Sequence, residues 1–129
     1  MSISAHAPRQ HLQYRPDAYE FVIKALTYTQ PMLNRRGSPR DEAAHVTGQE
    51  LLEGIRQYAA KLYGMMAPCV FHYWGVHSTE DFGRIVFELV ERGELHKTER
   101  DQLSDFENVY SFEEVFCRNY YIDASRTTT

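Results

Sequence analysis

One stretch of this sequence, Thr47 to Gly64, constrains the fold most, because both of its ends and its buried face are marked. Thr47 and Glu50 form a T-x-x-E capping box, in which each side chain satisfies a backbone amide of the first helical turn. Apolar residues then recur at helical spacing until Gly64, a typical stop. The pattern predicts an amphipathic helix. Gly54 lies beside its apolar stripe, where we expect a neighbouring element to exclude a side chain.

Three further helices are predicted from similar signals. The first runs from about Pro16 to Tyr28, with proline at a favourable first position. Another begins after Ser78, a capping residue, and is stopped by Gly93. The last begins at Ser111, which forms a second capping box, of the form S-x-x-E, with Glu114.

The conformation of two further regions is predicted from composition and apolar pattern. The apolar run at 68–74 fits a short buried strand or one helical turn, because periodicity cannot separate these in so few residues. The segments "ELHKT" and "FENVYSF" predict a small two-stranded ribbon near residues 94–110. A helix followed by such a ribbon is also the order of parts in a winged-helix-like fold.

The length of 129 residues allows one hydrophobic core, and a second independent core is not expected. The chain contains nine tyrosines and seven phenylalanines, so much of the core area should come from aromatic rings. We therefore expect an α+β, mainly α domain with about four helices around an aromatic-rich core. It should span residues 14–122, between a flexible N-terminal arm at 1–13 and a flexible tail at 123–129.

Charge and cysteine usage exclude several classes of protein. The net charge of −4 lacks the basic excess that general affinity for nucleic acid requires. Cys69 and Cys117 form neither a disulfide framework nor a CxxC zinc signature, and their apolar surroundings predict free buried thiols. The N-terminus lacks a secretory signal and no run is long enough to cross a membrane. We expect a cytoplasmic protein.

The strongest metal-ligand candidates are Cys69, His72 and His77, which lie within nine residues. Their spacing matches no established zinc pattern and no second cluster completes four ligands, so we expect neither a metal nor a cofactor. No nucleophile elbow, P-loop, dinucleotide turn or H-E-x-x-H helix is present. The sequence leaves an enzymatic function open, but no motif supports one.

The helix after Ser78 has the wrong charge for reading nucleic acid. At 100° per residue its outward arc holds four acids and one base: Glu80, Asp81, Arg84, Glu88 and Glu91. A recognition helix must present basic or amide groups to phosphates and base edges. Electrostatics therefore disfavour DNA or RNA binding through this helix.

Gly83 and Phe87 flank the apolar stripe of the same helix and are displaced toward solvent. An aromatic beside a bare glycine suggests that a second surface packs here. That surface is either the aromatic run Phe71–Trp74 of the same chain or a partner protein.

The densest basic group in this acidic chain is Arg35, Arg36 and Arg40, in a segment interrupted by proline and glycine. It is either an anion-binding or partner-docking loop, or a solvated linker.

At "HVTGQELLEGIRQYA", "STEDFGRIVFELVERGEL" and "DFENVYSFEEVF" the chain resembles a family of short bacterial proteins restricted to planctomycete and verrucomicrobial lineages, whose function is uncharacterised. The resemblance spans roughly residues 14–117. It implies a bacterial cytosolic protein of one domain and supplies no catalytic residues.

These observations favour a non-enzymatic protein-interaction or regulatory module that binds another protein, or itself as a homodimer. The alternative is a protein or enzyme that binds a small anionic ligand near Arg35, Arg36 and Arg40. A third hypothesis is nucleic-acid binding through that same loop.

Overall fold

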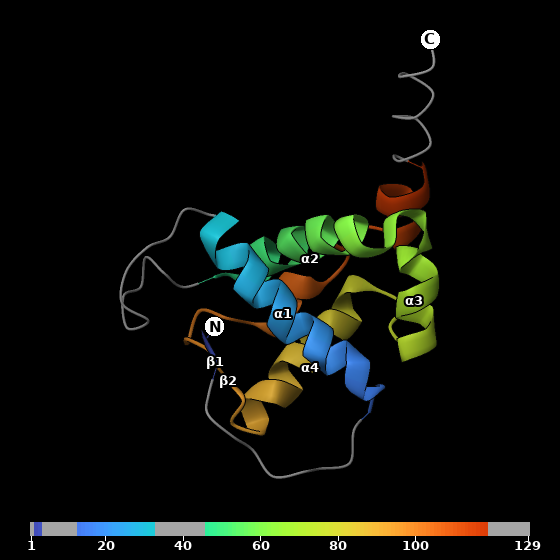
Figure 1. Cartoon of the computed structure of the whole chain (residues 1–129). Helices are drawn as coiled ribbons and strands as arrows, with labels where there is room; N and C mark the ends of the chain where they lie inside the picture. Colours follow the sequence, from blue (N-terminus) through green and yellow to red (C-terminus); the bar gives the residue numbers. More distant parts are fainter. Residues whose placement is uncertain (1, 4–12, 33–45, 119–129) are drawn as a thin grey trace.

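The computed structural model describes residues 2–3, 13–32 and 46–118 (Figure 1). Among these residues four α-helices dominate: α1 (Pro16–Met32), α2 (Gly48–Tyr63), α3 (Ala67–Trp74) and α4 (Thr79–Glu91). The described part of the chain also has three shorter helical segments: the 3₁₀ turns η2 (Gly64–Met66) and η3 (Leu103–Phe106), and the π-helix η4 (Glu113–Arg118). Two short strands, β1 (Ser2–Ile3) and β2 (Leu95–His96), pair antiparallel. The predicted mainly helical α+β class is confirmed.

The core is built around one fully buried ring, Phe71 of α3. The ring centroids of Phe82 and Phe112 each lie 5.0 Å from that of Phe71, and those of Phe21 and Phe116 lie 5.7 and 5.6 Å away. These partners come from α1, α4 and the C-terminal segment, so a single cluster of rings joins elements from the whole described chain. The predicted aromatic-rich core is confirmed.

The contact between α1 and α2 is closest at Gly54. A Cβ at this position would lie 1.8 Å from Thr29 Oγ1 of α1. Thr29 is fully buried, and its hydroxyl is satisfied by donating to the Ala25 carbonyl at 2.6 Å. The expectation that a neighbouring element excludes a side chain at Gly54 is therefore confirmed.

The ends of α2 follow the sequence signals. Thr47 N donates to Glu50 Oε1 at 3.0 Å, and Glu50 N donates to Thr47 Oγ1 at 3.1 Å, so the predicted capping box is present. Gly64 ends the helix with φ of +55°, a conformation that glycine adopts without steric cost. The first helix, by contrast, runs to Met32 instead of the predicted Tyr28. Pro31 lies in its last turn, so the missing amide interrupts the hydrogen-bond ladder one residue before the helix ends.

The ambiguous run at 68–74 is helical. Pro68 occupies the first turn of α3, where proline is tolerated. At the other end Gly75 has φ of +90°, and its amide donates back toward the carbonyls of Phe71 and His72. A glycine able to adopt a left-handed cap thus closes a helical turn that the apolar pattern alone did not specify.

The ribbon is built differently from the prediction. The partner of β2 is β1 from the N-terminus, and the segment after residue 98 folds back as η3. The cause is Phe106, whose ring is fully buried and whose carbonyl accepts a bond from Thr79 Oγ1 at 2.6 Å. This residue holds η3 against the start of α4, so the segment forms no wing.

The ends of the chain depart from the predicted boundaries. Ser2 and Ile3 of the predicted arm are paired with β2, while the remainder of the arm before residue 13 and the tail at 123–129 lie outside the described residues. The predicted last helix is the π-helix η4, where Glu114 N lies 3.5 Å from Ser111 Oγ. In the described part of the chain, no helix combines the length and the hydropathy needed to cross a membrane.

Candidate functional site

The longest uncharged stretch of the chain runs from Leu62 to Thr79 and contains no Asp, Glu, Lys or Arg in 18 residues. It forms the end of α2, the turn η2, α3 and the connection to α4. In Figure 1, α3 (yellow-green) lies at the edge of the molecule and crosses the end of α2. A charge-free segment at an edge is unusual in a chain that is 25% charged, because burial does not account for all of it.

One side of α3 is buried and the other presents apolar side chains to solvent. The core side consists of Ala67, Phe71 and Trp74. Four large apolar residues are exposed on this helix and just before it: Leu62 (49%) at the end of α2, Met65 (45%) and Met66 (60%) in η2, and Tyr73 (64%) on α3. We call these four residues together with the exposed Cys69 the α3 face. Three of them follow helical spacing, at 66, 69 and 73, so they lie on one side of the helix.

The ring of Tyr73 is held in place despite its exposure. The Arg15 guanidinium carbon lies 4.2 Å from the ring centroid, and Arg15 Nε donates to the Tyr73 carbonyl at 3.1 Å. The hydrogen bond to the backbone holds the guanidinium over the ring, and the cation–π attraction then favours this orientation of the ring. Tyr73 is therefore a preoriented part of the surface.

A groove of about 560 Å³ separates α3 from the C-terminal segment. Its lining is rich in groups able to act as nucleophiles or ligands, and comprises Pro68, Cys69, His72, Val76, His77, Ser111, Phe112, Glu113 and Cys117. The imidazole rings of His72 and His77 are in contact, with centroids 4.5 Å apart. The structure thus gathers the three metal-ligand candidates of the sequence and adds Cys117 to them.

The prediction of two buried thiols is wrong for Cys69, which is exposed because it lies on the outward side of α3. Cys117 is half-buried, and its Sγ donates to the Met65 carbonyl at 3.7 Å. Both cysteines are free. Over the described ranges, no three His, Cys, Asp or Glu side chains are placed to share a metal ion. The groove therefore brings these groups together from two sides.

A second, smaller pocket of about 320 Å³ lies where α1, α2 and α3 meet. Aromatic rings and charged groups line it together: Asp17, Glu20, Phe21, Lys24, Tyr58, Leu62, Tyr63 and Trp74. Burial, followed by the charges of Tyr58 and Asp17, raises the pKa of the Tyr63 hydroxyl. Sequence reasoning missed this pocket, because its rings come from three helices and share no local pattern.

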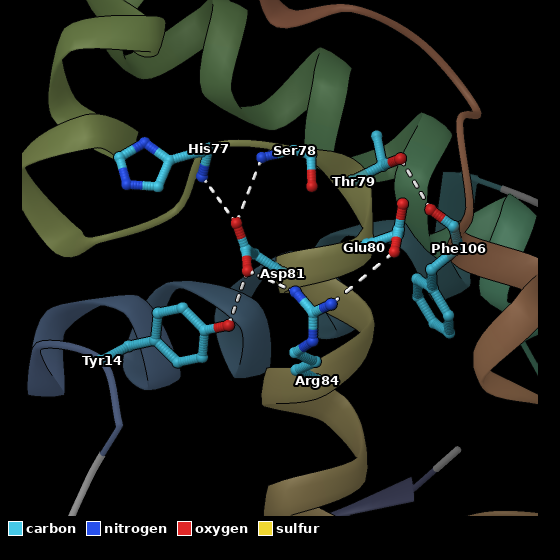
Figure 2. A network of polar contacts seen from close by, with 8 residues as sticks. All are labelled: Tyr14, His77, Ser78, Thr79, Glu80, Asp81, Arg84 and Phe106. Atoms are coloured by element: carbon cyan, nitrogen blue, oxygen red, sulfur yellow. Dashed lines mark hydrogen bonds and ion pairs between the residues drawn. The ribbon is translucent and has the colours of Figure 1, made fainter.

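The most elaborate polar cluster, shown in Figure 2, surrounds Asp81 at the start of α4. Its Oδ1 accepts from the Tyr14 hydroxyl at 2.7 Å and from Arg84 Nη1 at 2.8 Å. Its Oδ2 accepts from the amides of His77 at 2.8 Å and Ser78 at 3.3 Å. Burial alone would raise the pKa of Asp81, but these hydrogen bonds hold it below its usual value. A carboxylate so fully occupied fixes the helix start and is not poised for proton transfer.

The prediction that four acids of α4 face solvent is wrong for two of them. Asp81 is buried, and Glu88 Oε2 accepts a 2.6 Å bond from the Tyr19 hydroxyl. Burial and this bond raise the pKa of Tyr19 to about 12. The cause is the beginning of α1 and the segment just before it, which bring Tyr19 and Tyr14 to this side of α4. Glu91 and Arg84 remain exposed, so α4 still offers no basic surface.

The predicted partner surface at Gly83 and Phe87 is largely occupied by the chain itself. A Cβ on Gly83 would lie 2.7 Å from atoms of Phe106, so Gly83 is covered by η3 and removed from any partner surface. Phe87 is partly buried, and Lys97 Nζ lies 5.7 Å from its ring centroid. The packing is intramolecular, but it comes from Phe106 and not from the aromatic run Phe71–Trp74.

The basic loop formed by Arg35, Arg36 and Arg40 lies outside the described residues. Its assignment as an anion or partner loop stays a prediction.

Comparison with known proteins adds no assignment, since the chain matches no protein-family model, no curated protein and no solved structure. The resemblance to a planctomycete and verrucomicrobial family, and with it a bacterial and cytoplasmic origin, stays a prediction.

Proposed function

We propose that this chain is a non-enzymatic protein-interaction module that self-associates through the α3 face. The observation that supports this is the exposure of Leu62, Met65, Met66 and Tyr73 on a segment without charges. Scattered apolar residues on a surface are normal, but a group of large ones on one edge is typical of an interaction site.

The charge of the chain favours a second copy as the partner. Two molecules with a net charge of −4 repel each other over most of their surfaces. The α3 face, in contrast, brings no like charges together when it meets itself. An isologous dimer needs only such a self-complementary patch, because each side contributes the same residues.

The size of the patch limits the strength of the dimer. A standard interface buries roughly 800 Å² on each partner. Five side chains supply only part of that area, so we expect a reversible dimer that dissociates on dilution. Because the contact itself is uncharged, added salt should screen the net repulsion and strengthen association slightly.

Sedimentation equilibrium over a wide range of protein concentration tests this function. The wild-type chain should show a concentration-dependent dimer, and Met66→Glu should weaken dimerisation at least tenfold by placing two like charges at the contact. Glutamate at this position precedes α3 and complements the positive end of the helix dipole, so folding should be preserved.

Leu103→Glu provides the matched control. Leu103 is also a large exposed apolar residue, at 41%, but it belongs to η3 and not to the α3 face. Its substitution should leave dimerisation unchanged. A wild-type chain that stays monomeric at high concentration, or equal effects of the two variants, would contradict the proposal.

A further inference from the structure

The pocket between α1, α2 and α3 has the components of an aromatic cage. Four rings from three helices line it: Phe21 from α1, Tyr58 and Tyr63 from α2, and Trp74 from α3. Its volume of about 320 Å³ is at the lower end of the range for small-molecule sites, roughly 300–1,000 Å³. A group the size of a few methyl groups is therefore the natural occupant.

The rings are arranged as a corner. The planes of Tyr63 and Trp74 are inclined by 77°, with centroids 6.1 Å apart. The ring centroids of Phe21 and Trp74 lie 5.2 Å apart and their planes are inclined by 47°, so Phe21 adds a third ring to the same corner. Phe21 and Trp74 are almost fully buried, at 4% and 5% exposure, so packing fixes their orientation. Rings held at steep angles can present their electron-rich faces to one enclosed cation.

The charges of the lining have the sign that a cation requires. Asp17 and Glu20 are acidic and Lys24 is basic, so the lining carries two negative charges and one positive, a net charge of −1. Lys24 Nζ pairs with Glu20 Oε1 at 2.9 Å, and both side chains are mostly exposed. Asp17 forms no ion pair with another described residue, and its charge acts on Tyr63. One negative charge thus stays available beside the rings.

We infer that this pocket binds a quaternary or fully methylated ammonium group. Such a cation is large, weakly hydrated and without N–H donors, so it loses little on leaving water and needs no hydrogen-bond acceptors. The ring faces supply attraction, and Asp17 balances the charge. An inorganic cation would need several oxygen ligands at fixed distances, which an aromatic corner does not provide.

The chain contains its own reporter for this site, because Trp74 is its single tryptophan. Titration with tetramethylammonium chloride and with choline chloride should change the tryptophan fluorescence saturably, whereas sodium chloride at equal ionic strength should not. The uncharged isostere of choline, with carbon in place of nitrogen, should bind at least tenfold more weakly. Glycine betaine should also bind more weakly than choline, because its carboxylate meets the acidic rim.

Two substitutions at Tyr63 distinguish the contribution of the ring to binding from that of its hydroxyl. Tyr63→Phe keeps the ring face and should bind choline within about twofold of the wild type. Tyr63→Leu removes the ring and should weaken binding about tenfold. Asp17→Asn changes an exposed side chain, so it leaves the core intact and should weaken binding about threefold. Circular dichroism establishes that each variant is folded before the titration is interpreted.

The natural source of the cation is distinguished by comparing choline with Nε-trimethyl-lysine, each measured against its unmethylated amine. Preference for choline indicates a free or headgroup cation, and preference for trimethyl-lysine indicates a modified protein side chain. The inference is overturned if tetramethylammonium does not bind, if the uncharged isostere binds as well as choline, or if Asp17→Asn and Tyr63→Leu both bind like the wild type. Leu62 lines this pocket and also belongs to the α3 face, so the titrations are made at a protein concentration at which sedimentation shows the chain to be monomeric. A failure of cation binding is then distinct from a failure of dimerisation.

Discussion

The two consecutive helices α3 and α4 use their outward sides in opposite ways. On α4, Asp81 and Glu88 bind tyrosines from the start of the chain, and Phe106 covers Gly83. On α3 no Asp, Glu, Lys or Arg is present, and Tyr73 of this helix and Met66 just before it are the most exposed large apolar residues among those described. The helix with the clearer amphipathic pattern thus has much of its outward side covered by the chain itself, while Arg84 and Glu91 stay exposed. The helix with the poorer pattern offers the free surface.

The largest expected effect on the packing of α4 comes from substitution of Phe106. Phe106→Ala should lower the free energy of unfolding by about 3–5 kcal/mol, because this fully buried ring fills the space between α2 and α4. Urea denaturation monitored by circular dichroism measures the loss. A loss below about 1 kcal/mol would show that η3 does not close this side of α4.

Gly83→Ala gives an internal control for the same contact. In the wild type the added methyl group overlaps Phe106, and overpacking of about 1–3 kcal/mol outweighs the gain of about 1 kcal/mol in helix propensity. In the Phe106→Ala background the ring atoms are gone and only the contact with the Cβ of residue 106 is kept, so the same substitution should cost less than in the wild type. Equal costs in both backgrounds would contradict direct packing of Gly83 against Phe106.

These two residues also show where sequence reasoning stops. The capping box at Thr47 and Glu50 and the close approach at Gly54 could be predicted, because each signal is local or follows from helical periodicity. The partner of Gly83 could not be predicted, because Phe106 lies 23 residues further along the chain, in a segment with strand-like composition. Which distant residue packs against Gly83 depends on the tertiary fold, and the local spacing of residues carries no information about that.

The candidate sites were even less accessible to prediction. The run at 68–74 was too short for its periodicity to assign, yet it forms the edge helix that carries the α3 face. The aromatic pocket needs Phe21 and Trp74 to meet across more than fifty positions of sequence. The metal-ligand candidates Cys69, His72 and His77 do line one groove, but only the fold shows that Cys117 joins them.

A smaller effect is expected at Asp81, with a defined pH dependence. Asp81→Asn should lower the free energy of unfolding by roughly 2–3 kcal/mol at neutral pH, because charge-assisted hydrogen bonds become neutral ones. The folded-state pKa of Asp81 is lowered, so its stabilisation is complete above the ordinary carboxyl value of about 4 and is lost as the pH falls through the folded-state value. The wild type and the variant should therefore converge in stability below about pH 4.

Glu80→Gln is the matched control for that measurement. Glu80 is the neighbouring acid, and its Oε2 lies 3.7 Å from Arg84 Nη2 in a solvent-exposed pair. Such pairs contribute at most about 1 kcal/mol, so this substitution should change stability little at any pH. A pH profile for Glu80→Gln like that of Asp81→Asn would assign the effect to general charge and not to the buried network.

The smallest change in stability is expected at Tyr73, on the α3 face. Tyr73→Ser removes a ring that is 64% exposed and one cation–π contact with Arg15, which is worth about 0.5–1 kcal/mol at an exposed site. Urea denaturation at a protein concentration low enough to keep the chain monomeric measures this cost alone. The same substitution should weaken dimerisation in sedimentation experiments, because the ring is then missing from both sides of the contact. A loss of stability as large as that of Phe106→Ala would instead make Tyr73 part of the core, and the contrast between a free α3 and an engaged α4 would not hold.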